Sequence, residues 1–170
     1  MSWIYKVLIA VGVIAAIGVG TYVYMWWNDI RFMDFFQSPV AVLDTTVYAA
    51  QQSDTDTFKR GFTKETIKTM DQVHEFNTNR PPGDFDPKIH WTWDTLMALM
   101  AQEGGFDVVE EPSFFDRWSE DTVKVKIAFE NREKIYTLVR RGGVWRIDLM
   151  NSDPGFSKAR NCIRDATYCR

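Results

Sequence analysis

The sequence predicts an α+β protein in which one membrane-spanning helix precedes a roll of helices and then an antiparallel sheet. Three observations carry this prediction. Residues 7–27 contain no charged side chain, apolar residues then recur at helical spacing as far as residue 103, and from residue 106 they alternate with polar ones as in strands. Helices first and strands last is the α+β plan. A length of 170 residues leaves room for one ordinary domain beside the membrane segment.

The first apolar segment fits a membrane in length and in composition. As a helix, residues 7–27 span about 31 Å, which matches a hydrocarbon core of about 30 Å. Aromatic side chains that favour the headgroup level lie at both ends, namely Trp3, Tyr5, Tyr22, Tyr24, Trp26 and Trp27. We therefore interpret residues 1–29 as a short tail and a transmembrane helix. A cleaved secretory signal is the alternative, because small residues around Gly18 and Gly20 resemble a processing site.

Charges beside the helix predict its orientation. Lys6 and the amino terminus precede it, whereas Asp29 and Arg31 cancel after it. The positive-inside rule therefore favours a cytoplasmic N-terminus and an exported C-terminal domain.

Small residues within the helix predict what it contacts. Gly12, Ala16 and Gly20 recur every four residues and share one face, which lets a helix of another membrane subunit approach closely. The alternative is that Gly and Ala are simply common in membrane helices.

Residues 30–37 are expected to link the helix to a folded domain at 38–150. Ser38 and Pro39 are typical of a helix start. Apolar spacing predicts helices at 38–52, around 56–62, from Thr63 to about 78, and from Thr92 to Glu103, the last with Leu96, Leu99 and Met100 inward. Strands are expected at 106–118 (interrupted or bulged at Pro112), 123–130, 134–141 and 144–149.

The remaining residues, 151–170, are interpreted as a C-terminal tail. Cys162 and Cys169 are the only cysteines of the chain, and they do not form a CxxC pair. In an oxidising compartment we expect them to form a disulfide that ties down the terminus; two free thiols are the alternative. Neither histidine is near them in the sequence, so we expect no metal site.

The order of elements resembles the nuclear-transport-factor-two-like superfamily of cystatin-like α+β rolls. The likeness rests on TLVRRGGVWRIDL (Thr137 to Leu149) and on SPVAVLDTTVYAAQQSDTDTFKRGF near the start of the domain. A short tail, one anchor and an exported roll are also similar to the inner-membrane scaffold proteins of type IV secretion systems. The resemblance implies a bacterial inner membrane and a periplasmic domain. It implies no activity, because the superfamily contains both enzymes and scaffolds.

Catalytic and cofactor motifs are absent from the sequence: there is no P-loop, dinucleotide glycine pattern or Ser/His/Asp order, and we expect no cofactor. Asp71 and His74 share a helix face and are interpreted as solvated, with pairing as the alternative. His90, Trp91 and Trp93 flank a helix start, where we expect core or interface residues, with a ligand-stacking pocket as the alternative.

Charge excludes one class of partner and favours another. A net charge of −3 is not typical of a nucleic-acid-binding protein. Residues 84–121, however, contain ten Asp or Glu against Lys88 and Arg117. If they form one face, it would attract a basic soluble partner; an ordinary mixed surface is the alternative.

Together these features predict a non-catalytic accessory or scaffold subunit of a membrane complex, whose exported domain docks partner proteins. An energy-transducing complex, photosynthetic or respiratory, and a secretion machine both fit. The alternatives are a domain that binds a small ligand or performs acid–base catalysis in the pocket of the roll, and a homo-oligomeric ring.

Overall fold

The computed structural model describes residues 3–28, 30–78, 91–130 and 132–164, and the chain divides into two units, Met1–Phe36 and Gln37–Arg170. The first unit contains the helix α1 (Trp3–Trp27) and a short 3₁₀ helix, η1 (Phe32–Phe36). No residue of α1 is buried. Helix α1 is long and apolar enough to cross a membrane, as signal sequences also are. No other helix among the described residues has this length and composition.

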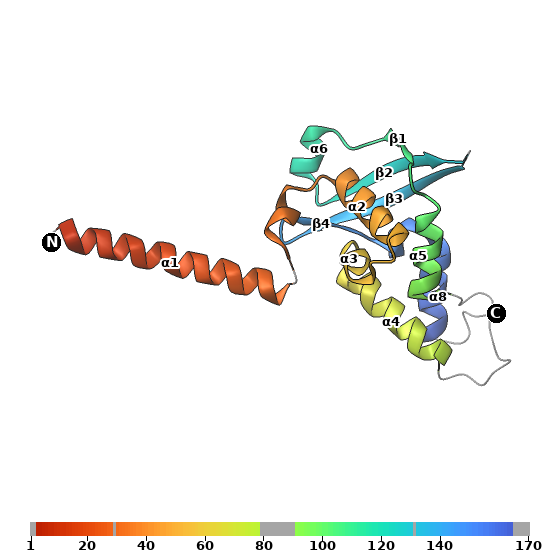
Figure 1. Cartoon of the computed structure of the whole chain (residues 1–170), viewed down its shortest axis with the longest axis horizontal. Coiled ribbons are helices and arrows are strands. Elements are labelled where there is room, and N and C mark those ends of the chain that lie inside the picture. The colour runs from red at the N-terminus through yellow and green to blue at the C-terminus, as the bar shows by residue number, and fades with distance from the viewer. Residues whose placement is uncertain (1–2, 29, 79–90, 131, 165–170) are drawn as a thin grey trace. The chain divides into compact units, whose positions relative to one another are not determined.

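The second unit is an α+β fold, as predicted. Its elements are α2 (Pro39–Gln51), α3 (Thr55–Arg60), α4 (Lys64–Thr78), α5 (Trp93–Ala101), β1 (Asp107–Glu110), α6 (Phe114–Ser119), β2 (Thr122–Phe129), β3 (Arg132–Arg141), β4 (Val144–Ile147), α7 (Leu149–Ser152) and α8 (Pro154–Arg164). The strands form one antiparallel sheet in the order β1-β2-β3-β4 (Figure 1). Helix α2 packs on β2 and β4.

Side-chain caps begin the helices where the sequence predicts them. The hydroxyl oxygen of Ser38 accepts a hydrogen bond of 3.2 Å from the backbone N–H of Ala41 at the start of α2. Thr63 and Thr92 accept equivalent bonds of 3.1 Å at the starts of α4 and α5. Each cap satisfies a donor that the first helical turn leaves without a partner.

The core lies between the helices and the inner face of the sheet. Strand register places Val125 of β2 opposite Tyr136 of β3, and Leu138 of β3 opposite Ile147 of β4. The large side chains that are fully buried come from both layers: Leu43, Phe58, Phe62, Met70, Leu96, Met100, Ile127, Tyr136, Leu138, Ile147 and Phe156.

The buried face of α5 differs from the predicted one. Leu96 and Met100 are buried as expected, but Leu99 is 41% exposed, and Trp93 and Met97 are buried instead. Trp93, in the first turn of this short helix, packs against the rings of Phe58 and Phe62. With Trp93 facing the core, Leu99 lies on the solvent side of the helix.

The strand predicted over 106–118, interrupted or bulged at Pro112, is confirmed only in its first part, and the prediction is wrong after Pro112. Only Asp107–Glu110 pairs with β2, and Phe114–Ser119 forms the helix α6. Pro112 cannot donate a backbone hydrogen bond, so the chain leaves the sheet there, and a capping box starts a helix directly after it.

A helix also replaces part of the expected C-terminal tail. Helix α8 packs against α4, and its Phe156 lies edge-on to Trp91 with ring centroids 5.7 Å apart. The predicted disulfide lies outside the described residues, because Cys169 is not among them and the structure does not describe the Cys162 side chain.

The two edges of the sheet differ. At β4, the backbone N–H of Ile147 donates to the carbonyl of Gly61 (2.7 Å), and its carbonyl accepts from Thr63 (3.0 Å). Gly61 has to be glycine, because an added Cβ would lie 2.1 Å from the hydroxyl oxygen of Thr46. At the opposite edge, no described strand pairs with the outer side of β1.

One carboxylate, that of Glu103, is buried where α5 ends. Lys134 Nζ lies 2.7 Å from its Oε1, and the hydroxyl of Tyr136 donates to its Oε2. Only 3% of the Glu103 side chain is exposed. Burial, and then the charge and hydrogen bond of Glu103, raise the pKa of Tyr136 well above its usual 10.0.

We expect Tyr136→Phe to lower the free energy of unfolding by about 1.5–3 kcal/mol at neutral pH, because Glu103 loses a charge-assisted hydrogen bond. A second effect concerns the wild type, whose free energy of unfolding should decrease as the pH rises above 10.0. There the unfolded chain releases the Tyr136 proton, whereas the folded chain, with its raised Tyr136 pKa, still holds it. The variant lacks this part of the fall. Urea unfolding of the full chain in detergent, at neutral and alkaline pH, measures both effects; an equal alkaline loss in the variant would contradict the assignment.

Candidate functional site

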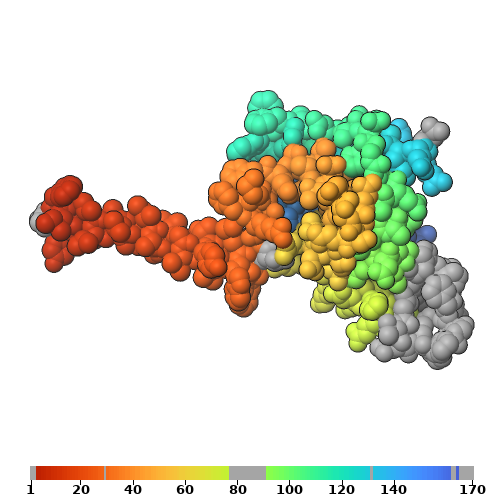
Figure 2. All heavy atoms as spheres, viewed as in Figure 1, coloured from red at the N-terminus to blue at the C-terminus, as the bar shows by residue number. Residues whose placement is uncertain are grey.

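The strongest candidate for a functional surface is the stretch 107–121, here termed the acidic–aromatic segment. None of its residues is buried, and it contains six Asp or Glu against the single Arg117. Five large apolar side chains of the segment are exposed: Val108, Val109, Phe114, Phe115 and Trp118. In Figure 2 the segment, green to teal, forms the upper margin of the second unit.

Three of these side chains form one aromatic surface on α6. Phe114, Phe115 and Trp118 are 64%, 79% and 71% exposed. The ring centroid of Phe114 lies 6.0 Å from that of Phe115 and 6.2 Å from that of Trp118, so the rings are neighbours. Contiguous exposed apolar surface of this kind marks interaction sites in soluble domains.

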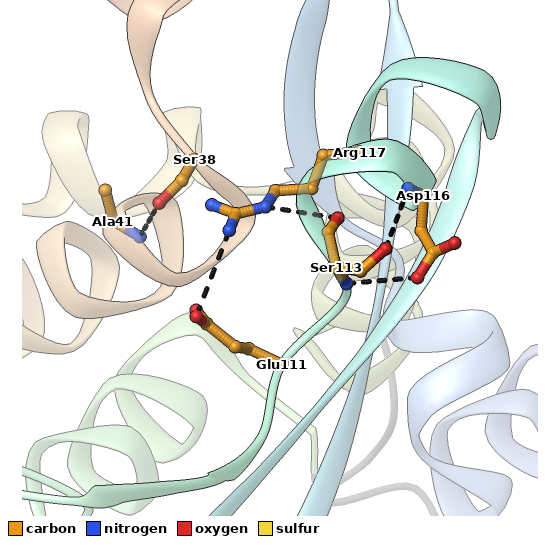
Figure 3. Close-up of polar contacts among 6 residues, drawn as sticks. All are labelled: Ser38, Ala41, Glu111, Ser113, Asp116 and Arg117. Carbon is orange, nitrogen blue, oxygen red and sulfur yellow. Dashed lines mark hydrogen bonds and ion pairs between the residues drawn. The ribbon is translucent and has the colours of Figure 1, made fainter.

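A capping box holds the first turn of α6. The hydroxyl oxygen of Ser113 accepts from the backbone N–H of Asp116 at 3.2 Å, and the Asp116 carboxylate accepts from the Ser113 N–H at 3.0 Å (Figure 3). Arg117 donates from Nε to the Ser113 carbonyl (3.4 Å), and its Nη2 lies 3.9 Å from Glu111 Oε1. A helix of six residues is unstable by itself in water, so these contacts are needed to keep the aromatic rings in place.

Arg140 of β3 holds the other end of α6. Its Nη1 donates to the carbonyl of Arg117 at 2.9 Å, and its Nη2 donates to the carbonyl of Trp118 at 3.1 Å. Its guanidinium also lies over the ring of Trp145, 5.4 Å from the centroid. The last carbonyls of a helix have no partner within the helix and carry partial negative charge. A cation that binds two of them therefore joins α6 to the sheet.

Apart from Asp107 in β1, the carboxylates of the segment divide into two groups. Glu111, Asp116 and Asp121 contact the groups that hold α6, the last through Arg140 at 3.4 Å. Glu110 and Glu120 are exposed, and neither has an ion pair or side-chain hydrogen bond with another described residue. These two carboxylates are therefore available to a binding partner without any change in the fold.

On α1, the structure places the predicted small-residue face and interfacial aromatics on the surface. Gly12, Ala16 and Gly20 are exposed, and an added Cβ at Gly12 or Gly20 would meet no heavy atom within 4 Å. The aromatic positions Trp3, Tyr22, Tyr24, Trp26 and Trp27 are 45–77% exposed. In η1, Phe32, Met33 and Phe36 add three apolar side chains that are 65–70% exposed.

His90, Trp91 and Trp93 were expected to be core or interface residues, with a ligand-stacking pocket as the alternative, and those in the described part of the chain lie in the core. Trp91 and Trp93 are buried in the core, where Trp93 Nε1 donates to Asp71 Oδ1 at 3.0 Å. His74 is exposed on α4. His90 lies outside the described residues, as do residues 84–90 of the predicted acidic face.

A surface hollow of about 330 Å³ lies along α4, lined by Lys64, Ile67, Lys68, Asp71, Gln72 and Glu75. All six residues belong to one helix, and the hollow is open to solvent. Among the described residues, no group of three or more His, Cys, Asp or Glu side chains is placed to hold a metal ion.

Sequence reasoning missed α6 and Arg140. Two local signals pointed to α6: Ser113 stands three residues before Asp116, the spacing of a capping box, and Phe114 stands four before Trp118, the spacing of one helix face. The role of Arg140 had no local signal, because its partners are 22 and 23 residues away in the sequence.

We expect Arg140→Ala to loosen α6, because two carbonyl oxygens lose a charged donor, worth about 1.5–3 kcal/mol. Arg140→Lys keeps the charge but loses the planar fork, so it should show an intermediate effect. Hydrogen–deuterium exchange of the amides in 117–121 measures the change. Arg141→Lys, at the exposed neighbouring position, is the control; unchanged protection in Arg140→Ala would show that other contacts hold the helix.

In comparisons with protein-family models, with curated proteins and with solved structures, the chain finds no match. The resemblance to the nuclear-transport-factor-two-like superfamily therefore stays a prediction, and function has to be argued from the residues themselves.

Proposed function

We propose that this chain is a single-pass membrane subunit whose folded unit docks a partner protein of a larger assembly. In this proposal α1 anchors the chain in a bacterial inner membrane, the N-terminus is cytoplasmic and the folded unit lies in the periplasm. The observation that carries the proposal is the aromatic surface of Phe114, Phe115 and Trp118, exposed yet held at both ends of α6.

The anchoring part of the proposal is supported by the composition of the first unit. A helix of 25 residues with none buried has no protein core to face, and lipid would satisfy its apolar side chains. The exposed aromatics at the end of α1 and in η1 suit the headgroup level, where a ring meets both hydrocarbon and water.

Contact with other membrane subunits is supported by the face of Gly12, Ala16 and Gly20. Within the described residues of this chain, nothing packs on the two glycines of that face. In lipid, small residues allow close helix contact where no hydrophobic driving force exists between helices.

The docking part is supported by the rigidity of α6. A flexible aromatic loop loses conformational entropy when it binds, whereas a surface already ordered by its own protein does not. The capping box and Arg140 provide this order before any partner arrives. Full burial of one such ring contributes about 1.5–3 kcal/mol, so the three rings provide an apolar centre for a larger contact.

Purification of the full chain from its native membrane tests the docking role. We expect Phe115→Ser and Trp118→Ser each to reduce co-purifying protein by about tenfold or more, because an anchor ring of an interface is lost. Tyr48→Ser is the matched control, since Tyr48 is an aromatic side chain of α2 that is also exposed (61%). Retention of all partner protein by both α6 variants would show that the aromatic surface is not a docking site.

A second set of variants tests the membrane helix. We expect Gly12→Leu and Gly20→Leu to weaken association with other membrane subunits, because a large side chain separates the two helices. Gly18→Leu makes the same change on the opposite face of α1, where an added Cβ also meets no atom within 4 Å, and should leave association intact. The measure is recovery of the complex after mild detergent extraction; equal losses for all three variants would contradict a specific packing face.

A further inference from the structure

Building on the proposed docking function, we propose that the acidic–aromatic segment binds a protein segment in which an apolar anchor is flanked by Lys or Arg side chains. The centre of the surface is apolar, formed by Phe114, Phe115 and Trp118, and its surroundings are acidic. A complementary partner has the reverse charge around an apolar centre.

The acidic rim is independent of the contacts that hold α6. Glu110 precedes the helix and Glu120 follows it, and neither has an ion pair with another described residue. Both are exposed to solvent, and in the sequence each lies within four residues of an aromatic side chain of α6. They therefore attract cationic groups to this surface, an effect that salt weakens with a screening length of about 8 Å at physiological ionic strength.

Charge also decides against two other occupants. In a contact between two copies through this surface, six carboxylates of one segment would face six of the other, with one Arg117 on each side. An anionic lipid surface repels the segment for the same reason, because membrane surfaces carry a negative potential. A basic protein surface is the occupant that this charge favours.

The backbone of β1 points to recognition by side chains. Its outer edge has no described strand beside it, but the register shifts between Val108 and Glu110. A bulge of this kind interrupts the ladder and protects an edge against the addition of another strand. The exposed aromatic rings of α6 and the carboxylates of Glu110 and Glu120 thus provide the binding groups.

Photo-crosslinking in native membranes tests the proposal. The full chain carries p-benzoylphenylalanine in place of Phe115 or, in a second variant, of Val109, so that the result does not depend on one position. Mass spectrometry then identifies the crosslinked peptide. We expect a segment of another protein whose crosslinked apolar residue has Lys or Arg within a few positions. High salt should lower the yield.

Charge variants separate this inference from the docking function as such. In the crosslinking chain, Glu110→Gln with Glu120→Gln should lower the yield about 2- to 10-fold, since two rim charges are removed. Glu65→Gln with Glu75→Gln removes two exposed charges from α4 and should leave the yield unchanged.

Each contrary outcome has a distinct meaning. A crosslink to another protein that is insensitive to the rim variants and to salt overturns the basic-partner inference but leaves docking in place. Crosslinks only to lipid, only to a second copy, or to nothing overturn both.

Discussion

An open sheet of four strands has two edges with unpaired backbone groups, and the protein has to deal with both. The β4 edge is closed by residues 61–63, which bond to Ile147 on both sides of its peptide group. This closure requires a glycine at position 61, where the chain passes against Thr46 of α2. The other edge is short, bulged and acidic. The acidic–aromatic segment, 107–121, starts at this edge, and none of its residues is buried. The candidate site therefore lies beside the edge of the sheet that no described strand covers.

The hairpin of β3 and β4 connects stability to the candidate site. Tyr136 and Lys134 of β3 bind the buried carboxylate of Glu103. Burying a charge costs less free energy when the charge has such partners than when it is isolated. Arg140 follows Lys134 by six residues on the same face of β3, and it lies over the ring of Trp145 and donates to the carbonyls of Arg117 and Trp118 in α6. One face of β3 therefore secures α5 at one end and α6 at the other.

The particular successes and failures of the sequence prediction have physical reasons. The helix starts at Ser38, Thr63 and Thr92 could be predicted because a side-chain cap is a local interaction over three residues. The strand expected over 106–118 rested on a change to period-two spacing in this part of the chain, which includes the apolar residues Val108, Val109, Phe114 and Phe115. In the structure all four are exposed, and hydrophobic periodicity assumes that apolar side chains face a core. In this segment they face solvent, so that assumption fails, and failures of this kind are expected at functional sites.

The sequence by itself determined the apolar α1, the order of helices before an antiparallel meander, and the starts of the capped helices. It also determined the turn between β3 and β4 at Gly142–Gly143, where φ angles of 60° and 83° favour glycine. These features depend on neighbours along the chain or on composition. Only the tertiary structure decided that Trp91 and Trp93 belong to the core, that Leu99 faces solvent, and that Arg140 holds α6. Each of these depends on groups that are distant in sequence, and such contacts leave no periodic trace in a single chain.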